Sequence, residues 1–100
     1  MFEHYIPSIT TQQLKEKLNQ NIQLIDVREE DEYNNGHISQ AINIPLSTIQ
    51  QFNKDKAQTY YLICQSGRRS QQAAEFLQTL GYHAINISGG MNQWTGPITR

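Results

Sequence analysis

The chemistry that this sequence could carry centres on Cys64, its only cysteine. Cys64 ends an apolar segment, and a polar stretch with two arginines, Gln65-Ser66-Gly67-Arg68-Arg69, follows it directly. A thiol reacts as its thiolate, and a free cysteine with a pKa of about 8.5 is mostly protonated at neutral pH. Loop N–H groups, a helix N-terminus and nearby guanidinium groups each favour the anion. The segment therefore predicts an anion-binding loop around a reactive thiolate.

A helix is expected directly after this loop, because apolar residues recur at helical spacing in Ala73, Phe76, Leu77 and Leu80. Arg68 and Arg69 would lie in its first turn, where unpaired N–H groups already make the helix end positive. Arginines at that end are expected when they partner a bound anion. Gly67 would allow a tight turn, and Ser70 could cap the helix or donate a hydroxyl hydrogen bond.

Cys64 could instead be a small buried apolar residue, as unpaired cysteines often are. The polar and doubly basic loop directly after it favours the reactive interpretation. The histidines His4, His37 and His83 are not spaced with Cys64 as metal ligands would be. We therefore expect neither a metal nor another cofactor.

The elements that must position this loop are short apolar, β-branched segments, expected to be strands, at residues 22–27, 41–44, 59–63 and 84–87, with a weaker candidate at 5–6. Helix signals lie between them. Thr10 with Gln13 forms a capping box, and Ser47 with Gln50 offers another. The acidic residues 29–32 suit a first helical turn, with Gly36 as its C-cap. Strands alternating with helices predict an α/β sandwich with a mainly parallel sheet.

Ligands of open parallel sheets bind at the carboxyl ends of the strands. Two of the expected strands end in polar chemistry: Asp26-Val27-Arg28 follows one, and Cys64 follows another. This geometry could bring them to the same edge of the sheet, although the strand order cannot be read from the sequence.

The composition limits the classes of function. One hundred residues make one domain, and the net charge of -1 indicates no broad attraction to nucleic acid. No apolar segment is long enough to cross a membrane, and the N-terminus lacks the layout of a signal peptide. One cysteine cannot form an internal disulfide, so we expect a cytoplasmic protein.

Three segments together resemble the rhodanese-like sulfurtransferase domains, over about residues 9–94. They are LIDVREEDEYNNGHISQAINIP (residues 24–45), ICQSGRRS (residues 63–70) and NISGGMNQW (residues 86–94). Their order, spacing and cysteine match the family's strand–helix–strand signature, active-site loop and closing segment. The resemblance implies a three-layer sandwich with about five strands, helices on both faces, and a single domain over residues 1–100.

The resemblance also implies a persulfide mechanism. The Cys64 thiolate would take the sulfane sulfur from a donor such as thiosulfate or a persulfide. The loop N–H groups, helped by Arg68 and Arg69, would stabilise the persulfide anion. Cyanide or a thiol would then accept the sulfur. With no second cysteine the acceptor must be external, and a partner protein could donate or accept the sulfur.

Related phosphatases and arsenate reductases share the fold but have a longer Cys-x5-Arg loop. Here the residue six after Cys64 is Ser70, and the arginines come earlier. The six-residue loop from Cys64 to Arg69 looks like the sulfurtransferase form, which argues against phosphatase activity.

Several other positions match the family. Asp26 and Arg28 match its Asp-x-Arg and would either support the loop or form a surface salt bridge of little energy. Glu32, four residues after Arg28, is expected to pair with it along a helix. Some thiosulfate-using members carry a basic residue at this position, so Glu32 argues against efficient use of thiosulfate. His37 is expected to be structural, and Met91 and Trp94 to pack the final helix onto the sheet.

Two alternatives to the thiosulfate enzyme stay open. In a sensing or non-catalytic module, an accessible Cys64 of low pKa would be oxidised and reduced reversibly while the domain binds a partner. In a sulfur relay, another enzyme's persulfide would load Cys64, and thiosulfate would react slowly.

Overall fold

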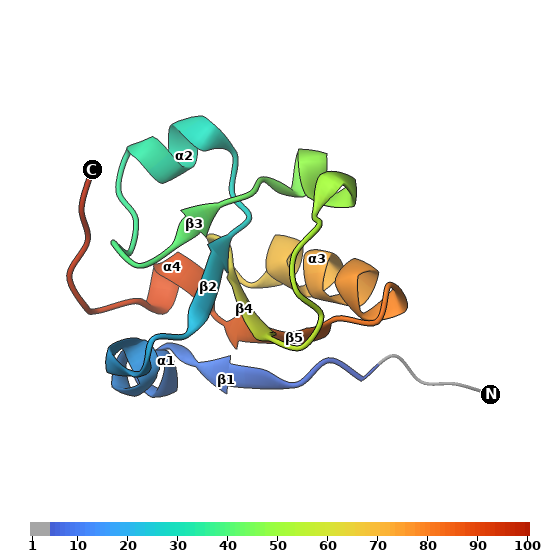
Figure 1. Cartoon of the computed structure of the whole chain (residues 1–100). Coiled ribbons are helices and arrows are strands. Elements are labelled where there is room, and N and C mark those ends of the chain that lie inside the picture. The colour runs from blue at the N-terminus through green and yellow to red at the C-terminus, as the bar shows by residue number, and fades with distance from the viewer. Residues whose placement is uncertain (1–4) are drawn as a thin grey trace.

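A computed structural model describes residues 5–100 of the chain, so His4 lies outside the described residues. Five parallel strands form one sheet in the order β1-β5-β4-β2-β3, with helical segments on both faces (Figure 1). This is the α/β, mainly parallel, five-stranded sandwich expected from the sequence. The elements in chain order are β1 (Ser8–Thr10), α1 (Thr11–Lys17), η1 (Leu18–Gln20), β2 (Gln23–Asp26), α2 (Glu30–Asn34), β3 (Ile42–Asn43), η2 (Leu46–Gln51), β4 (Thr59–Ile63), α3 (Arg68–Thr79), β5 (His83–Ser88) and α4 (Gly90–Gln93).

The sheet is buried on both sides, as parallel sheets usually are. Consecutive residues of β4 show this directly, because Leu62 and Ile63 point to opposite faces and neither has exposed surface. Leu62 packs with Ala73 and Leu77 of α3, whereas Ile63 packs with Leu14 of α1. Figure 1 shows α3 on one side of the strands and α1 and α4 on the other.

The first strand differs from its prediction. Residues 5–6 are not a strand; β1 begins at Ser8 and pairs with β5 from Asn86 onward. It runs directly into α1, whose N-cap is Thr10. The strand has only three residues, and the last of them is also the helix cap. This is too short for an apolar pattern, so the first strand was predicted at the wrong residues.

The helix starts agree with the sequence in two cases out of three. The Thr10 hydroxyl accepts a hydrogen bond from the Gln13 N–H (3.1 Å), which confirms that capping box. In α2 the acidic residues occupy the first turn as expected, and Gly36 comes one residue after the C-cap, Asn35. The Ser47 capping box was wrong, because residues 46–51 form a 3-10 helix and the Ser47 hydroxyl donates to Glu29 Oε1 (2.9 Å).

Parallel pairing brings the ends of β2 and β4 to the same edge. Asp26 is the register partner of Ile63, and the Val27 N–H donates to the Ile63 carbonyl (2.9 Å). Cys64 follows Ile63 at the end of this interior strand. The two polar strand ends identified in the sequence are therefore direct neighbours.

Candidate active site

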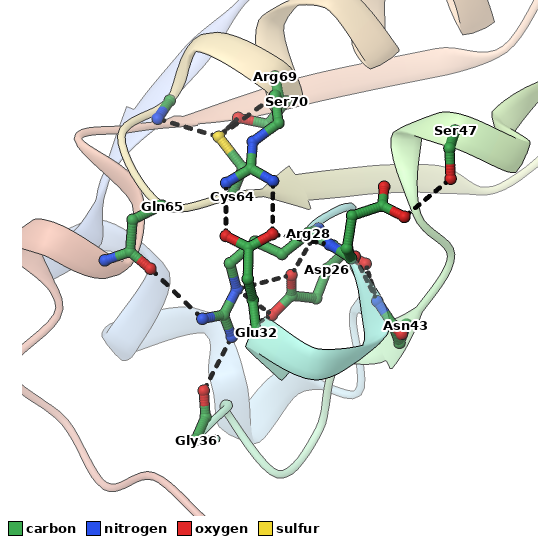
Figure 2. Close-up of polar contacts among 12 residues, drawn as sticks. Asp26, Arg28, Glu32, Gly36, Asn43, Ser47, Cys64, Gln65, Arg69 and Ser70 are labelled. Atoms are coloured by element: carbon green, nitrogen blue, oxygen red, sulfur yellow. Dashed lines mark hydrogen bonds and ion pairs between the residues drawn. The ribbon is translucent and has the colours of Figure 1, made fainter. Parts of the chain in front are cut away.

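Cys64 lies at the turn between β4 and α3, and its sulfur faces backbone donors. The N–H groups of Gly67 and Ser70 point at Sγ from 3.1 and 3.3 Å, and the Ser70 hydroxyl oxygen lies 3.3 Å from it. Figure 2 shows the loop folded around the sulfur. Three groups thus converge on one sulfur atom and form a cradle around it.

Glycine is required at Gly67 because the cradle closes tightly. Its φ is +100°, a left-handed conformation that other residues rarely adopt, and a Cβ there would lie 3.2 Å from the Gly89 nitrogen. Gly67 is also the N-cap of α3. Ser70 is therefore not the helix cap, and its hydroxyl is free to bond inside the loop.

The cradle changes the acidity of the thiol. Burial raises the pKa of Cys64, but it is outweighed by the N–H groups of Ser70, Gly67 and Ser66, together with the Ser70 hydroxyl when its hydrogen points to the sulfur, so the pKa lies below its ordinary value. Cys64 has no exposed surface in this structure. The accessible thiol that a sensing module would need is therefore not seen in this structure.

The start of α4 closes the loop from the other side. The N–H groups of Met91 and Asn92 donate to the carbonyls of Cys64 (2.8 Å) and Gln65 (2.9 Å). A Cβ on Gly90 would lie 2.3 Å from the Cys64 carbonyl oxygen, so only glycine allows this approach. The Gly89-Gly90 pair thus forms the turn into the last helix.

The end of β2 carries a buried ion pair. Asp26 has no exposed surface and Arg28 only 4 %, and Arg28 Nη2 donates to Asp26 Oδ2 (2.8 Å). The same Nη2 donates to the Gly36 carbonyl (2.8 Å), and Nη1 approaches Gln65 Oε1 at 3.4 Å. The surface salt bridge considered from the sequence was wrong, because this pair is buried and reaches the active loop (Figure 2).

A second ion pair joins α2 to the start of α3. Arg69 grips Glu32 with two parallel hydrogen bonds, of 2.7 and 2.8 Å, and both side chains are about one-third exposed. Hydrogen bonding to Arg69 lowers the pKa of Glu32 to about 2 despite opposing burial. The expected Glu32–Arg28 pair is therefore wrong. Each carboxylate instead has its own arginine.

The two loop arginines have different surroundings. The hydrogen bonds to Glu32 raise the pKa of Arg69. Both terminal nitrogens of this guanidinium therefore already bind a carboxylate of the same chain. Arg68 is exposed, and no ion pair to it is found among residues 5–100. Both arginines lie in the first turn of α3, where the sequence placed them, but the internal partner of Arg69 was not predicted.

The remaining predicted residues are placed as follows. Gln65 donates from Nε2 to Asn92 Oδ1 (2.7 Å), and Ser66 is exposed. His37 stacks on Tyr33 at 3.7 Å between ring centroids, and its Nδ1 lies 2.8 Å from the Tyr33 carbonyl, a structural arrangement. Met91 and Trp94 pack against the apolar cluster under α1, as expected.

A shallow cleft of about 340 Å³ lies beside the loop. Its lining includes Arg28, Glu32, Gln65, Met91, Trp94 and Ile98. Gln65, the residue after Cys64, lines this cleft, whereas Cys64 itself does not. Within residues 5–100, no group of three or more His, Cys, Asp and Glu side chains could hold a metal ion. In the same range, no helix has the length and apolar character needed to cross a membrane.

Sequence reasoning missed Asn86, a buried polar residue of β5 that contacts the loop. Its Oδ1 accepts from the Ser70 hydroxyl, and its Nδ2 donates to the Gly67 carbonyl (3.2 Å). The available signal was an amide inside the otherwise apolar residues 84–87. Buried amides need partners, so such a residue marks a polar network.

Fold and site together define a parallel α/β domain with a cysteine loop at the end of an interior strand. The chain belongs to the rhodanese-like domain family, whose model matches residues 10–97. A rhodanese-like domain protein from Staphylococcus aureus has a solved structure with a TM-score of 0.81 and 40% identity, covering 90% of this chain and 92% of that one.

Several curated relatives carry sulfurtransferase names, and two of them differ widely in size. The thiosulfate sulfurtransferase PspE of Escherichia coli (strain K12) is 36% identical over 77 residues, which are 73% of this chain and 74% of the relative. The adenylyltransferase and sulfurtransferase uba4 of Ogataea parapolymorpha is 34% identical over 79 residues, 75% of this chain but only 20% of that protein. Similarity to sulfurtransferases therefore extends to both small and large proteins.

Proposed function

We propose that this domain transfers sulfane sulfur through a persulfide formed on Cys64. The observation that carries the proposal is the convergence of two backbone N–H groups on Sγ, which favours the thiolate and offers donors for an anionic sulfur. The similarity to proteins named sulfurtransferase supports the same reaction class.

The first half-reaction is a displacement at sulfur. The Cys64 thiolate attacks the sulfane sulfur of the donor, a new S–S bond forms, and the old bond breaks with its electron pair leaving on the donor's other fragment. With thiosulfate that fragment is sulfite; with a persulfide it is a thiolate. The Cys64 persulfide anion is then stabilised by the loop N–H groups of Gly67 and Ser70.

The second half-reaction returns the thiolate. A thiol or cyanide attacks the outer sulfur and Cys64 leaves with the electron pair, giving a new persulfide or thiocyanate. Cys64 is the only cysteine of the chain, so the acceptor is external. The cleft beside Gln65 provides room for the organic part of a donor or acceptor.

A relay loaded by a partner's persulfide is the second candidate. The ion pair of Arg69 with Glu32 favours it, because the guanidinium that could bind a small dianion already holds a carboxylate. In this case thiosulfate would load Cys64 slowly, whereas a persulfide would load it readily.

Intact-mass spectrometry tests the proposal directly. The purified chain is measured before and after incubation with thiosulfate or with a low-molecular-weight persulfide, alongside Cys64→Ser as the matched control. We expect the mass of one added sulfur atom, removed by cyanide or by a thiol and absent from Cys64→Ser. Loading by the persulfide alone would favour the relay.

If neither donor loads the chain while peroxide oxidises Cys64 reversibly, sulfur transfer is wrong and the sensing module replaces it. Gln72→Ala serves as a second control, because this exposed side chain lies on α3 outside the loop. It should load as the wild type does.

A further inference from the structure

Asn86 is the buried polar residue that ties the sheet to the catalytic loop. It has 6 % exposed surface and lies on β5. Its side chain bonds three residues at the start of α3: Oδ1 lies 2.5 Å from the Ser70 hydroxyl oxygen, and Nδ2 lies 3.2 Å from the Gly67 carbonyl and 3.3 Å from Gln71 Oε1. All of its side-chain polar atoms are therefore used within this junction.

These partners fix the orientation of the Asn86 amide. Reversing it would place Oδ1 against the Gly67 carbonyl oxygen, where two acceptors would repel. It would also require Gln71 to reverse, and Gln71 is held because its Nε2 donates to Glu75 Oε2 (3.1 Å). The carbonyl oxygen of Asn86 therefore faces Ser70.

The Ser70 hydroxyl has one hydrogen and two neighbours that could accept it. Asn86 Oδ1 lies at 2.5 Å and Cys64 Sγ at 3.3 Å. Because Oδ1 can only accept, the hydrogen lies between Ser70 and Asn86. The hydroxyl then presents a lone pair to the sulfur, which can accept a bond from the protonated thiol but gives none to the thiolate.

We propose that Asn86 is a positioning residue for the nucleophile: it holds the Ser70 hydroxyl hydrogen away from Cys64. The hydroxyl then gives the thiolate no hydrogen bond, so the backbone N–H groups stabilise the thiolate and the hydroxyl stabilises the thiol. The Ser70 hydroxyl contact lowers the pKa of Cys64 only where its hydrogen turns to the sulfur, which Asn86 opposes.

This restraint matters for reactivity. The nucleophilicity of a thiolate falls as its pKa falls, with a Brønsted coefficient of about 0.4–0.5. A third hydrogen bond would yield more thiolate at low pH, but that thiolate would react more slowly. The value of this balance for sulfur transfer rests on the proposed function; the orientation of the hydroxyl does not.

The charged groups near the sulfur stay unchanged in a test at residues 70 and 86. From α3 and α2 they are the paired Arg69 and Glu32, with Arg68 exposed beside them. From the end of β2 they are the paired Asp26 and Arg28. When residue 86 is the same in both proteins, a difference in the Cys64 pKa between Ser70 and Ser70→Ala therefore measures the effect of the hydroxyl.

The experiment is a double-mutant cycle of Ser70→Ala and Asn86→Val, with the Cys64 pKa read from the ultraviolet absorbance of the thiolate against Cys64→Ser. In the wild-type background Ser70→Ala should leave the pKa within about 0.3 units or lower it. In the Asn86→Val background, where the hydroxyl is free to turn, Ser70→Ala should raise it by about one unit.

Two further measurements sharpen the result. Asn86→Val alone should lower the pKa by about one unit and reduce the high-pH rate of iodoacetamide alkylation about threefold. Circular dichroism checks that each variant folds.

An equal rise of the pKa on Ser70→Ala in all backgrounds would overturn the proposal. If Asn86→Val does not fold, the wild-type background decides alone: a rise of about one unit contradicts the proposal, and no change or a fall supports it. None of these measurements needs a sulfur donor. A chain that never forms a persulfide would therefore contradict the proposed function and leave this inference standing.

Discussion

Two arginine–carboxylate pairs flank the candidate loop, and they differ in almost everything except their chemistry. Asp26 and Arg28 are buried, two residues apart, and Arg28 also reaches the Gly36 carbonyl and Gln65. Glu32 and Arg69 are about one-third exposed and join two helices 37 residues apart. The buried pair therefore acts as a brace inside the fold, whereas the exposed pair lies at the rim of the site.

The energetic consequences should differ in the same way. Breaking a buried pair leaves a desolvated charge without a partner, which costs several kcal/mol. An exposed pair is screened by water and contributes little, typically about 0–1 kcal/mol. Good geometry, which both pairs have, does not by itself make a pair important for stability.

The largest expected effect comes from the buried brace. Arg28→Met or Asp26→Leu should each lower the free energy of unfolding by about 3–5 kcal/mol, measured by urea denaturation. The double variant should lose less than the two single losses added together, because no unpaired charge stays buried. A loss below about 1 kcal/mol for Arg28→Met would show that the brace resembles a surface pair.

A smaller effect is expected at the rim. Glu32→Gln should change the free energy of unfolding at pH 7 by less than about 1 kcal/mol. The folded-state pKa of Glu32 is about 2, below its ordinary value of 4.5, so the unfolded chain binds the proton first as the pH falls. The contribution of Glu32 is thus present above about pH 4.5 and lost towards pH 2.

The measurement is urea denaturation of the wild type and Glu32→Gln between these pH values. Their difference in stability should shrink as the pH falls. Glu30→Gln is the control on the same helix, because no ion pair to Glu30 is found among the described residues. A difference that stays constant down to pH 2 would contradict the assignment.

The smallest expected effect is on the thiol. Arg69→Ala should raise the pKa of Cys64 by about half a unit, because a positive charge is lost and the Glu32 carboxylate stays. Adding Glu32→Gln should reverse most of this rise, since the opposed fields of the pair nearly cancel. The pH dependence of alkylation measures both. A rise above about one unit in the double variant would make Arg69, rather than the backbone, the main source of thiolate stabilisation.

The sequence could predict the features that depend on neighbouring residues. The strand at Thr59–Ile63, the cysteine after it and the helix beyond Gly67 were each indicated by local patterns and lie where expected. The capping box at Thr10 was of the same kind. Such signals are encoded within a few residues, so no knowledge of the fold was needed.

The partners of the polar side chains could not be predicted, because they come from distant parts of the chain. Glu32 was assigned to Arg28 on helical spacing, yet α2 begins only at Glu30, so Arg28 lies outside the helix. Arg28 instead folds back on Asp26, and Glu32 meets an arginine 37 residues away. Asn86 was missed for the same reason, since its role depends on Ser70, 16 residues away.

The strands at the two edges of the sheet have a consequence for the behaviour of the domain at high concentration. β1 has three residues and β3 only two, and Pro7 and Pro45 lie just beyond them. Long unpaired edge strands can add strands from other molecules, whereas short edges and prolines, which lack an N–H donor, prevent such addition. These short edges should therefore protect the domain from aggregation by backbone pairing between edge strands of different molecules.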